Sequence, residues 1–65
     1  MLKARKEREA HGWSISRLAR EAELHISTVS SIESGRLKPY RVQAEKLAHA
    51  LGWQSDPADL FKEAE

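Results

Sequence analysis

The stretch SISRLAREAELHISTVSSIESG, residues 14–35, decides the fold. Its first part carries apolar residues at the i, i+3, i+4 and i+7 positions, the spacing of one face of an α-helix. These residues are Ile15, Leu18, Ala19 and Ala22. Ser14 precedes them and is suited to cap the first turn. The pattern therefore predicts a helix beginning at Ile15.

A second helix is predicted from His25 or Ile26 to Ser34. At about 100° per residue, Val29, Ile32 and Glu33 share one side, with Ile26 at its margin. The other side is lined by hydroxyls, and we call it the hydroxyl edge: Ser27, Thr28, Ser30, Ser31 and Ser34. Gly35 is suited to close the helix in a left-handed conformation. A glutamate on the apolar side and an edge of hydroxyls both require an explanation.

The connection between these two helices is very short, because only Glu23, Leu24 and His25 separate them. Such a connection forces a sharp corner between the helices. This is the helix-turn-helix arrangement, in which the second helix can be presented to the major groove of DNA. Spacing alone leaves open any other small helical bundle with a similar corner.

The flanking segments predict three more short helices. One spans residues 2–10, which are rich in Ala, Lys, Arg and Glu, and Gly12 is placed to end it. Another follows Pro39, with an apolar stripe of Ala44, Leu47, Ala48 and Leu51, and stops at Gly52. A last short helix begins at Pro57 with Ser55 or Asp56 as its cap. Trp13 is expected at a joint of the core. Trp53, Leu60 and Phe61 belong to the core or to a dimer surface, with the core favoured for Trp53 and Phe61.

Composition limits the class of protein. The chain has 65 residues, which fits a single domain over residues 1–65, and it has no Cys for a disulfide or a thiolate metal site. It lacks an apolar run that could span a bilayer, so we expect a cytoplasmic protein without membrane contact. Residues 1–46 hold ten Lys and Arg against six acids, and residues 47–65 hold one against four. A basic body favours a polyanionic partner, although an ordinary solvated surface explains the charge equally well.

The run GWSISRLAREAELHISTVSSIESGRLKP, residues 12–39, resembles the helix-turn-helix domains of the Cro/phage-repressor type, also called the xenobiotic-response-element family. The resemblance extends from about residue 4 to 61. It is carried by Arg8, Gly12-Trp13-Ser14, Leu18-Ala19, Ile32-Glu33-Ser34-Gly35, Pro39 and Leu47-Ala48-His49-Ala50-Leu51-Gly52. It implies an all-α, compact five-helix lambda-repressor-like DNA-binding domain, with the helix-turn-helix motif at about residues 15–34.

The resemblance also implies a role for Glu33. In this family an Arg of the first helix pairs with the glutamate that ends the recognition helix, and the matching residues are Arg8 and Glu33. An unpaired carboxylate on an apolar face is costly, whereas a guanidinium can satisfy it with two hydrogen bonds. We therefore expect Arg8 and Glu33 to form a structural ion pair.

The family's DNA contacts map onto the second helix of the motif and its surroundings. Base contacts are expected from Ile26, Ser27, Thr28 and Ser31, and backbone contacts from Ser14, Ile15, Arg17, Ser30, Arg36, Lys38 and Arg41. Hydroxyls bond to many bases with little preference, and Ile26 can contact a thymine methyl group. We therefore expect modest direct readout, with sequence preference from methyl contacts, DNA shape or bridging water.

The sequence departs from the family pattern at three positions. Glu23 stands where Gly is frequent, and a left-handed backbone there would cost a non-Gly residue about 1–2 kcal/mol. His25 takes the usual place of a capping Ser or Thr, and Glu7 replaces an apolar residue. These departures bear on stability more than on the fold.

The sequence gives little support for metal binding or nucleophilic catalysis. The three His residues lack metal-ligand spacing, and no nucleophile motif is present, so we expect no enzyme, metal, cofactor or small-molecule ligand. The sequence predicts a sequence-specific DNA-binding transcriptional regulator, a repressor, acting on double-stranded DNA as a homodimer. The alternative is a protein-interaction or antitoxin-like module on the same scaffold.

Overall fold

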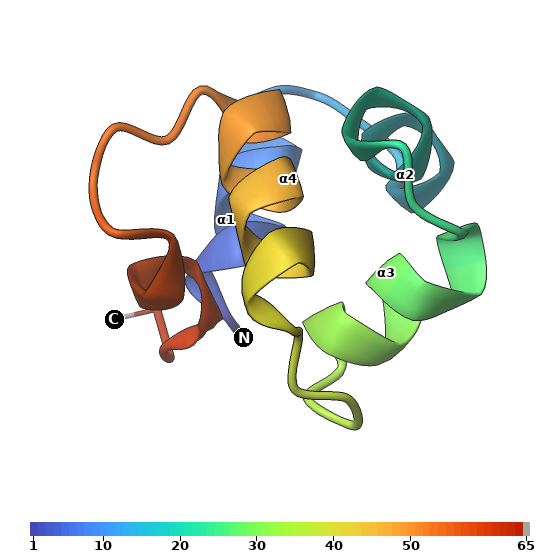
Figure 1. The fold of residues 1–65 in the computed structure, drawn as a ribbon. Coiled ribbons are helices and arrows are strands. Elements are labelled where there is room, and N and C mark those ends of the chain that lie inside the picture. The colour runs from blue at the N-terminus through green and yellow to red at the C-terminus, as the bar shows by residue number, and fades with distance from the viewer. Residues whose placement is uncertain (65) are drawn as a thin grey trace.

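The computed structural model describes residues 1–64 and consists of short helices around one core (Figure 1). Its elements are α1 (Lys3–Ala10), α2 (Ile15–Ala22), α3 (Ile26–Glu33), α4 (Arg41–Leu51) and η1 (Pro57–Phe61). α2 packs against both α3 and α4, and α4 and α1 both pack against η1. The all-helical prediction is confirmed, since the only β-type pairing within residues 1–64 is an isolated bridge between Leu2 and Glu63.

The fifth predicted helix differs from expectation, because the segment Pro57–Phe61 is a 3₁₀ helix and the described residues contain four α-helices. Asp56 caps it, since its side chain accepts a hydrogen bond from the backbone N–H of Ala58 at 3.0 Å. The turn is closed by a bond from the N–H of Asp59 to the carbonyl of Asp56. A segment of five residues is too short to gain much from the i→i+4 ladder, and such segments commonly adopt 3₁₀ geometry.

All four α-helices end in the same way. Each is followed by one residue with positive φ, namely Gly12, Glu23, Gly35 and Gly52. After α3, the N–H of Arg36 bonds to the carbonyl of Ser31, and the N–H of Gly35 to that of Ile32. This is the Schellman motif, which satisfies carbonyls that the helix leaves free. The predicted roles of the three glycines as helix stops are confirmed.

The core is built from the predicted apolar stripes. Its largest fully buried side chains are Leu18, Val29, Ile32, Leu47 and Leu60. Trp13, Trp53 and Phe61 are partly buried and pack against this cluster. Leu60 therefore belongs to the core, and the aromatic residues cover its margins.

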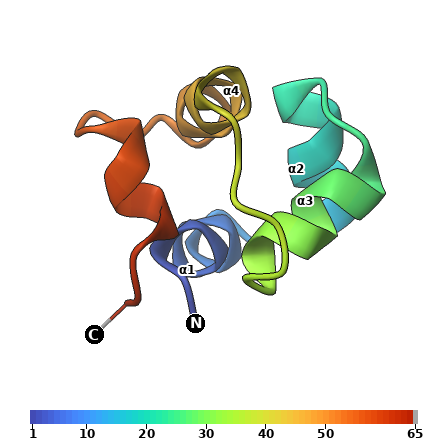
Figure 2. The same cartoon turned by 60° about the horizontal axis from the view of Figure 1, so that its bottom comes forward.

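The two ends of the described chain lie side by side (Figure 2). The N–H of Lys3 bonds to the carbonyl of Lys62 at 3.0 Å, and that of Ala64 to the carbonyl of Met1 at 2.8 Å. Together with η1 they form one end of the molecule, and the corner between α2 and α3 lies at the other end (Figures 1 and 2). The corner is thus left uncovered by the rest of the described chain.

Candidate nucleic-acid interface

The corner between α2 and α3 keeps a tight geometry in spite of its glutamate. Glu23 has φ 57° and ψ 42°, a left-handed conformation. The N–H of Leu24 bonds to the carbonyl of Ala19 at 2.9 Å, and that of Glu23 to the carbonyl of Arg20 at 3.2 Å. These bonds stabilise the turn, and Glu23 is exposed, so its side chain meets no obstacle. Glu23 therefore departs from the family pattern in residue type, while its backbone has the left-handed conformation that Gly would adopt there.

The hydroxyl edge is open at its two ends and half-buried between them. Ile26 is 47% exposed, and Ser27 is also exposed. Thr28, Ser30 and Ser31 are half-buried, and Ser34 at the other end is exposed. Of the residues predicted to contact bases, Ile26 and Ser27 are thus the most accessible, while Thr28 and Ser31 lie closer to the body of the protein.

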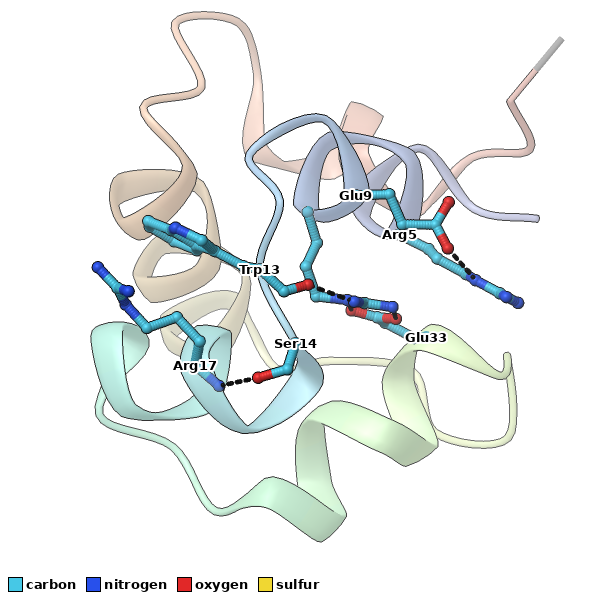
Figure 3. A network of polar contacts seen from close by, with 7 residues as sticks. Arg5, Glu9, Trp13, Ser14, Arg17 and Glu33 are labelled. Carbon is cyan, nitrogen blue, oxygen red and sulfur yellow. Dashed lines mark hydrogen bonds and ion pairs between the residues drawn. The ribbon is translucent and has the colours of Figure 1, made fainter.

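The buried side of α3 carries the expected ion pair. The Nε of Arg8 donates to Oε2 of Glu33 at 2.8 Å, and its Nη2 donates to Oε1 at 3.1 Å. The third nitrogen, Nη1, donates to the carbonyl of Trp13 at 2.6 Å. The two side chains are only 10% and 5% exposed. Figure 3 shows the carboxylate of Glu33 and the main-chain carbonyl of Trp13 close together, both bonded to the same guanidinium. The pair connects α1 to the end of α3.

The N-terminus of α2 lies beside α3 and offers donor groups. The N–H groups in the first turn of a helix have no partner within the helix. The Oγ of Ser14 accepts a hydrogen bond from the N–H of Arg17 at 3.0 Å, as Figure 3 shows. This leaves the N–H groups of Ile15 and Ser16 available, together with the hydroxyl hydrogen of Ser14. Such a turn, with its positive dipole end, suits an anion.

Two of the predicted phosphate-binding cations are paired within their own helix. The Nε of Arg17 lies 3.0 Å from Oε2 of Glu21, and its guanidinium lies 5.0 Å from the ring centre of Trp13. Likewise, the Nε of Arg41 lies 3.4 Å from Oε2 of Glu45. All four side chains of these pairs are well exposed, so the pairs are weak and can exchange partners.

The loop after α3 carries the other predicted cations, Arg36 and Lys38, both exposed. The Nε of Arg36 donates to the Oγ of Ser34 at 3.1 Å, which holds its side chain beside the end of α3. The predicted backbone-contact residues at the start of α2 and in the following loop therefore both lie near the end of α3, since Ile15 lines a hollow with Glu33 and Ser34, and Arg36 bonds to Ser34.

Arg5 is a further basic residue at this surface that the sequence pattern does not single out. It lines a small hollow of about 230 Å³ together with Ile15 and Ser34. Its Nε bonds to Oε2 of Glu9 at 3.2 Å. The sequence could have indicated Arg5, because it is one helical turn before Arg8 and therefore shares the face of α1 that meets α3.

Two large apolar side chains are exposed at the start of α4. Tyr40 is 76% exposed and Val42 is 61% exposed. Beside them is a pocket of about 430 Å³ between α4 and η1, lined by Lys38, Pro39, Arg41, Ala44, Glu45, Asp56, Pro57, Ala58 and Phe61. We call Tyr40, Val42 and this pocket the α4–η1 patch.

Two short helices meeting at a tight corner, with an open second helix, define a helix-turn-helix domain. A sequence model of the family described as the helix-turn-helix domain matches residues 2–61. The chain belongs to this family, in agreement with its resemblance to the Cro/phage-repressor type. Membership indicates a DNA-binding regulator. Searches of the curated proteins and of the solved structures found no match to the chain. Within residues 1–64, none of the helices has the length and apolarity that crossing a membrane would require.

Proposed function

We propose that this protein is a sequence-specific DNA-binding transcriptional regulator, a repressor, that inserts α3 into the major groove. One observation carries the proposal: the start of α3 is exposed and bears a small hydroxyl side chain, while free N–H groups of α2 and the cation Arg36 lie near the end of α3. Small side chains let a helix enter a groove deeply, and cations and free N–H groups beside the helix can bind the phosphate backbone that borders the groove.

In this arrangement the contacts divide into two groups. Ile26, Ser27, Thr28 and Ser31 face the bases, and Ile26 provides an apolar contact for a thymine methyl group. Ser14, Ile15, Arg17, Ser30, Arg36, Lys38 and Arg41 contact the sugar–phosphate backbone, and we add Arg5 to them. Since α3 carries no Arg, Asn or Gln for a bidentate base contact, DNA shape contributes to specificity.

We further propose that the protein binds DNA as a homodimer through the α4–η1 patch. The pocket is lined by the cations Lys38 and Arg41 and by the acids Glu45 and Asp56, and Arg41 pairs with Glu45 within α4. In a two-fold dimer the same surface of each copy meets itself. Tyr40 supplies the apolar area. Such a dimer would bind half-sites one helical turn, roughly 34 Å, apart. Sedimentation of the parent and of Val42→Glu tests whether the dimer forms through this patch.

The test of DNA insertion is a fluorescence-polarisation titration of a labelled random duplex at low and moderate salt. Two variants carry the same new charge. Ser27→Glu places it on the exposed start of α3, where a carboxylate also suits the helix dipole and leaves the helix intact. Ser55→Glu places it in the exposed loop before η1.

We expect salt-sensitive binding by the parent, a loss of at least about tenfold in Ser27→Glu, and near-parent affinity in Ser55→Glu. Equal losses in both variants would refute insertion of α3. Flat anisotropy of the parent at both salt concentrations would refute DNA binding and favour the alternative, an antitoxin-like protein-interaction module using the α4–η1 patch.

A further inference from the structure

The start of α3 contains a side-chain contact that determines how one serine can bond to DNA. The imidazole of His25 caps α3, and its Nδ1 accepts the backbone N–H of Ser27 at 3.3 Å. The same Nδ1 lies 2.8 Å from the Oγ of Ser27. Both residues are exposed, at the N-terminal end of the hydroxyl edge.

The roles of donor and acceptor in this contact follow from the backbone. A backbone N–H can only donate, so the bond from the N–H of Ser27 assigns the acceptor role to Nδ1 and the ring proton to Nε2. An unprotonated Nδ1 can only accept. With Nδ1 as the acceptor, the hydroxyl of Ser27 is assigned as the donor at 2.8 Å, and its hydrogen shares the single Nδ1 lone pair with the longer bond from the N–H.

The consequence concerns the side of Ser27 that faces the groove. With its hydrogen directed at His25, Ser27 presents only lone pairs to DNA. The other bonded hydroxyls differ: Ser14 accepts from the N–H of Arg17 and keeps its hydrogen free, while Ser34 donates to the carbonyl of Ser31 and accepts from Arg36. Ser27 is thus the accessible α3 hydroxyl that the contact with His25 restricts to accepting.

We propose that His25 is a positioning residue that makes Ser27 select a base with an exocyclic amino group in the major groove. Adenine presents its N6 amino group and cytosine its N4 amino group there, whereas guanine and thymine present acceptors at O6 and O4. Ser27 in its acceptor state bonds to the first two and repels the last two. This inference rests on the proposed insertion of α3. It limits the operators that the protein binds to those with adenine or cytosine opposite Ser27.

The first test uses the protein without DNA. A long-range ¹H–¹⁵N correlation spectrum at neutral pH distinguishes the two tautomers of a neutral imidazole. We expect His25 to carry its proton on Nε2, and the spectrum of Ser27→Ala to retain this tautomer because the backbone N–H still needs an acceptor. A parent spectrum with the proton on Nδ1 would overturn the inference.

The second test is selection of duplexes from a random pool, with four proteins. In the parent we expect one base pair per half-site at which adenine or cytosine is preferred by roughly two- to tenfold, the range of one net hydrogen bond. Ser27→Ala should lose the preference at that pair. His25→Asn retains an acceptor at the cap and should retain the preference. His25→Ala frees the hydroxyl and should admit all four bases at that pair while leaving the other pairs unchanged.

The outcomes separate the inference from the function on which it rests. If the parent selects a site without any preference that depends on Ser27, DNA binding stands and the inference fails. If His25→Ala keeps the parent preference, or loses affinity equally for every sequence, His25 is a structural cap only and the inference also fails. Circular dichroism of each variant verifies that α3 is formed. Absence of binding to any duplex would refute the proposed function, and the inference with it.

Discussion

Replacement of Glu33 by Ala should strongly destabilise the protein. The substitution leaves the guanidinium of Arg8 buried, with the carbonyl of Trp13 as its remaining partner. Both hydrogen bonds to Glu33 join charged groups that are nearly fully buried. Removing one partner of such a pair costs about 3–5 kcal/mol, because the other charge stays buried without compensation.

A matched surface pair supplies the control. Arg5 and Glu9 form an i,i+4 pair in α1 whose side chains are 49% and 46% exposed. Pairs of this type contribute about 0.3–0.5 kcal/mol. Glu9→Ala therefore removes the same functional group at a small cost, and the difference between the two variants measures the effect of burial.

The assay is urea unfolding followed by far-UV circular dichroism and tryptophan fluorescence. At roughly 0.05–0.15 kcal/mol per residue, a chain of this length has only about 3–10 kcal/mol of stability. Glu33→Ala can therefore unfold the protein outright, and Glu33→Gln, which keeps an acceptor, serves as the milder variant. Heating gives a second measure, since 1 kcal/mol corresponds to about 4–8 °C in a domain of this size.

The double variant Arg8→Met with Glu33→Leu tests whether the unpaired buried charge causes the loss of stability. It removes both charges and fills the space with apolar groups, so most of the lost stability should return. If Glu33→Ala and Glu9→Ala have the same urea midpoint, the argument from burial is wrong.

Three further predictions concern the proposed interface and the corner. Arg36→Ala should weaken binding to all duplexes alike and reduce the salt slope by about one, whereas Lys6→Ala, which removes a charge near the C-terminal segment, should leave the slope unchanged. Glu21→Gln should raise DNA affinity several-fold in a polarisation titration, because it frees the α2 arginine that it pairs with, while Asp59→Asn in η1 should not. Glu23→Gly should stabilise the protein by roughly 0.5–1 kcal/mol in urea unfolding, since Gly adopts the left-handed conformation without strain; a lower midpoint would contradict this.

Much of the fold follows from patterns that act over one or two helical turns. The stripe from Ile15 to Ala22 and the placement of Gly35 predict where α2 and α3 begin and end, because helix periodicity and the left-handed cap depend on neighbouring residues alone. The same local patterns do not distinguish a 3₁₀ helix from an α-helix at Pro57–Phe61, where the energies of the two differ little over five residues.

The sequence by itself determined the α-helices, the corner and the hydroxyl edge, whose members are set by spacing. Only the tertiary structure decided which partner each long polar side chain takes: Arg17 bonds to Glu21, Arg5 comes to the end of α3, and His25 orients the hydroxyl of Ser27. The physical reason is the distance along the chain over which each interaction acts. A helical stripe is specified by residues three and four apart, whereas a flexible side chain can reach several partners of similar energy, and the packing of the helices selects among them.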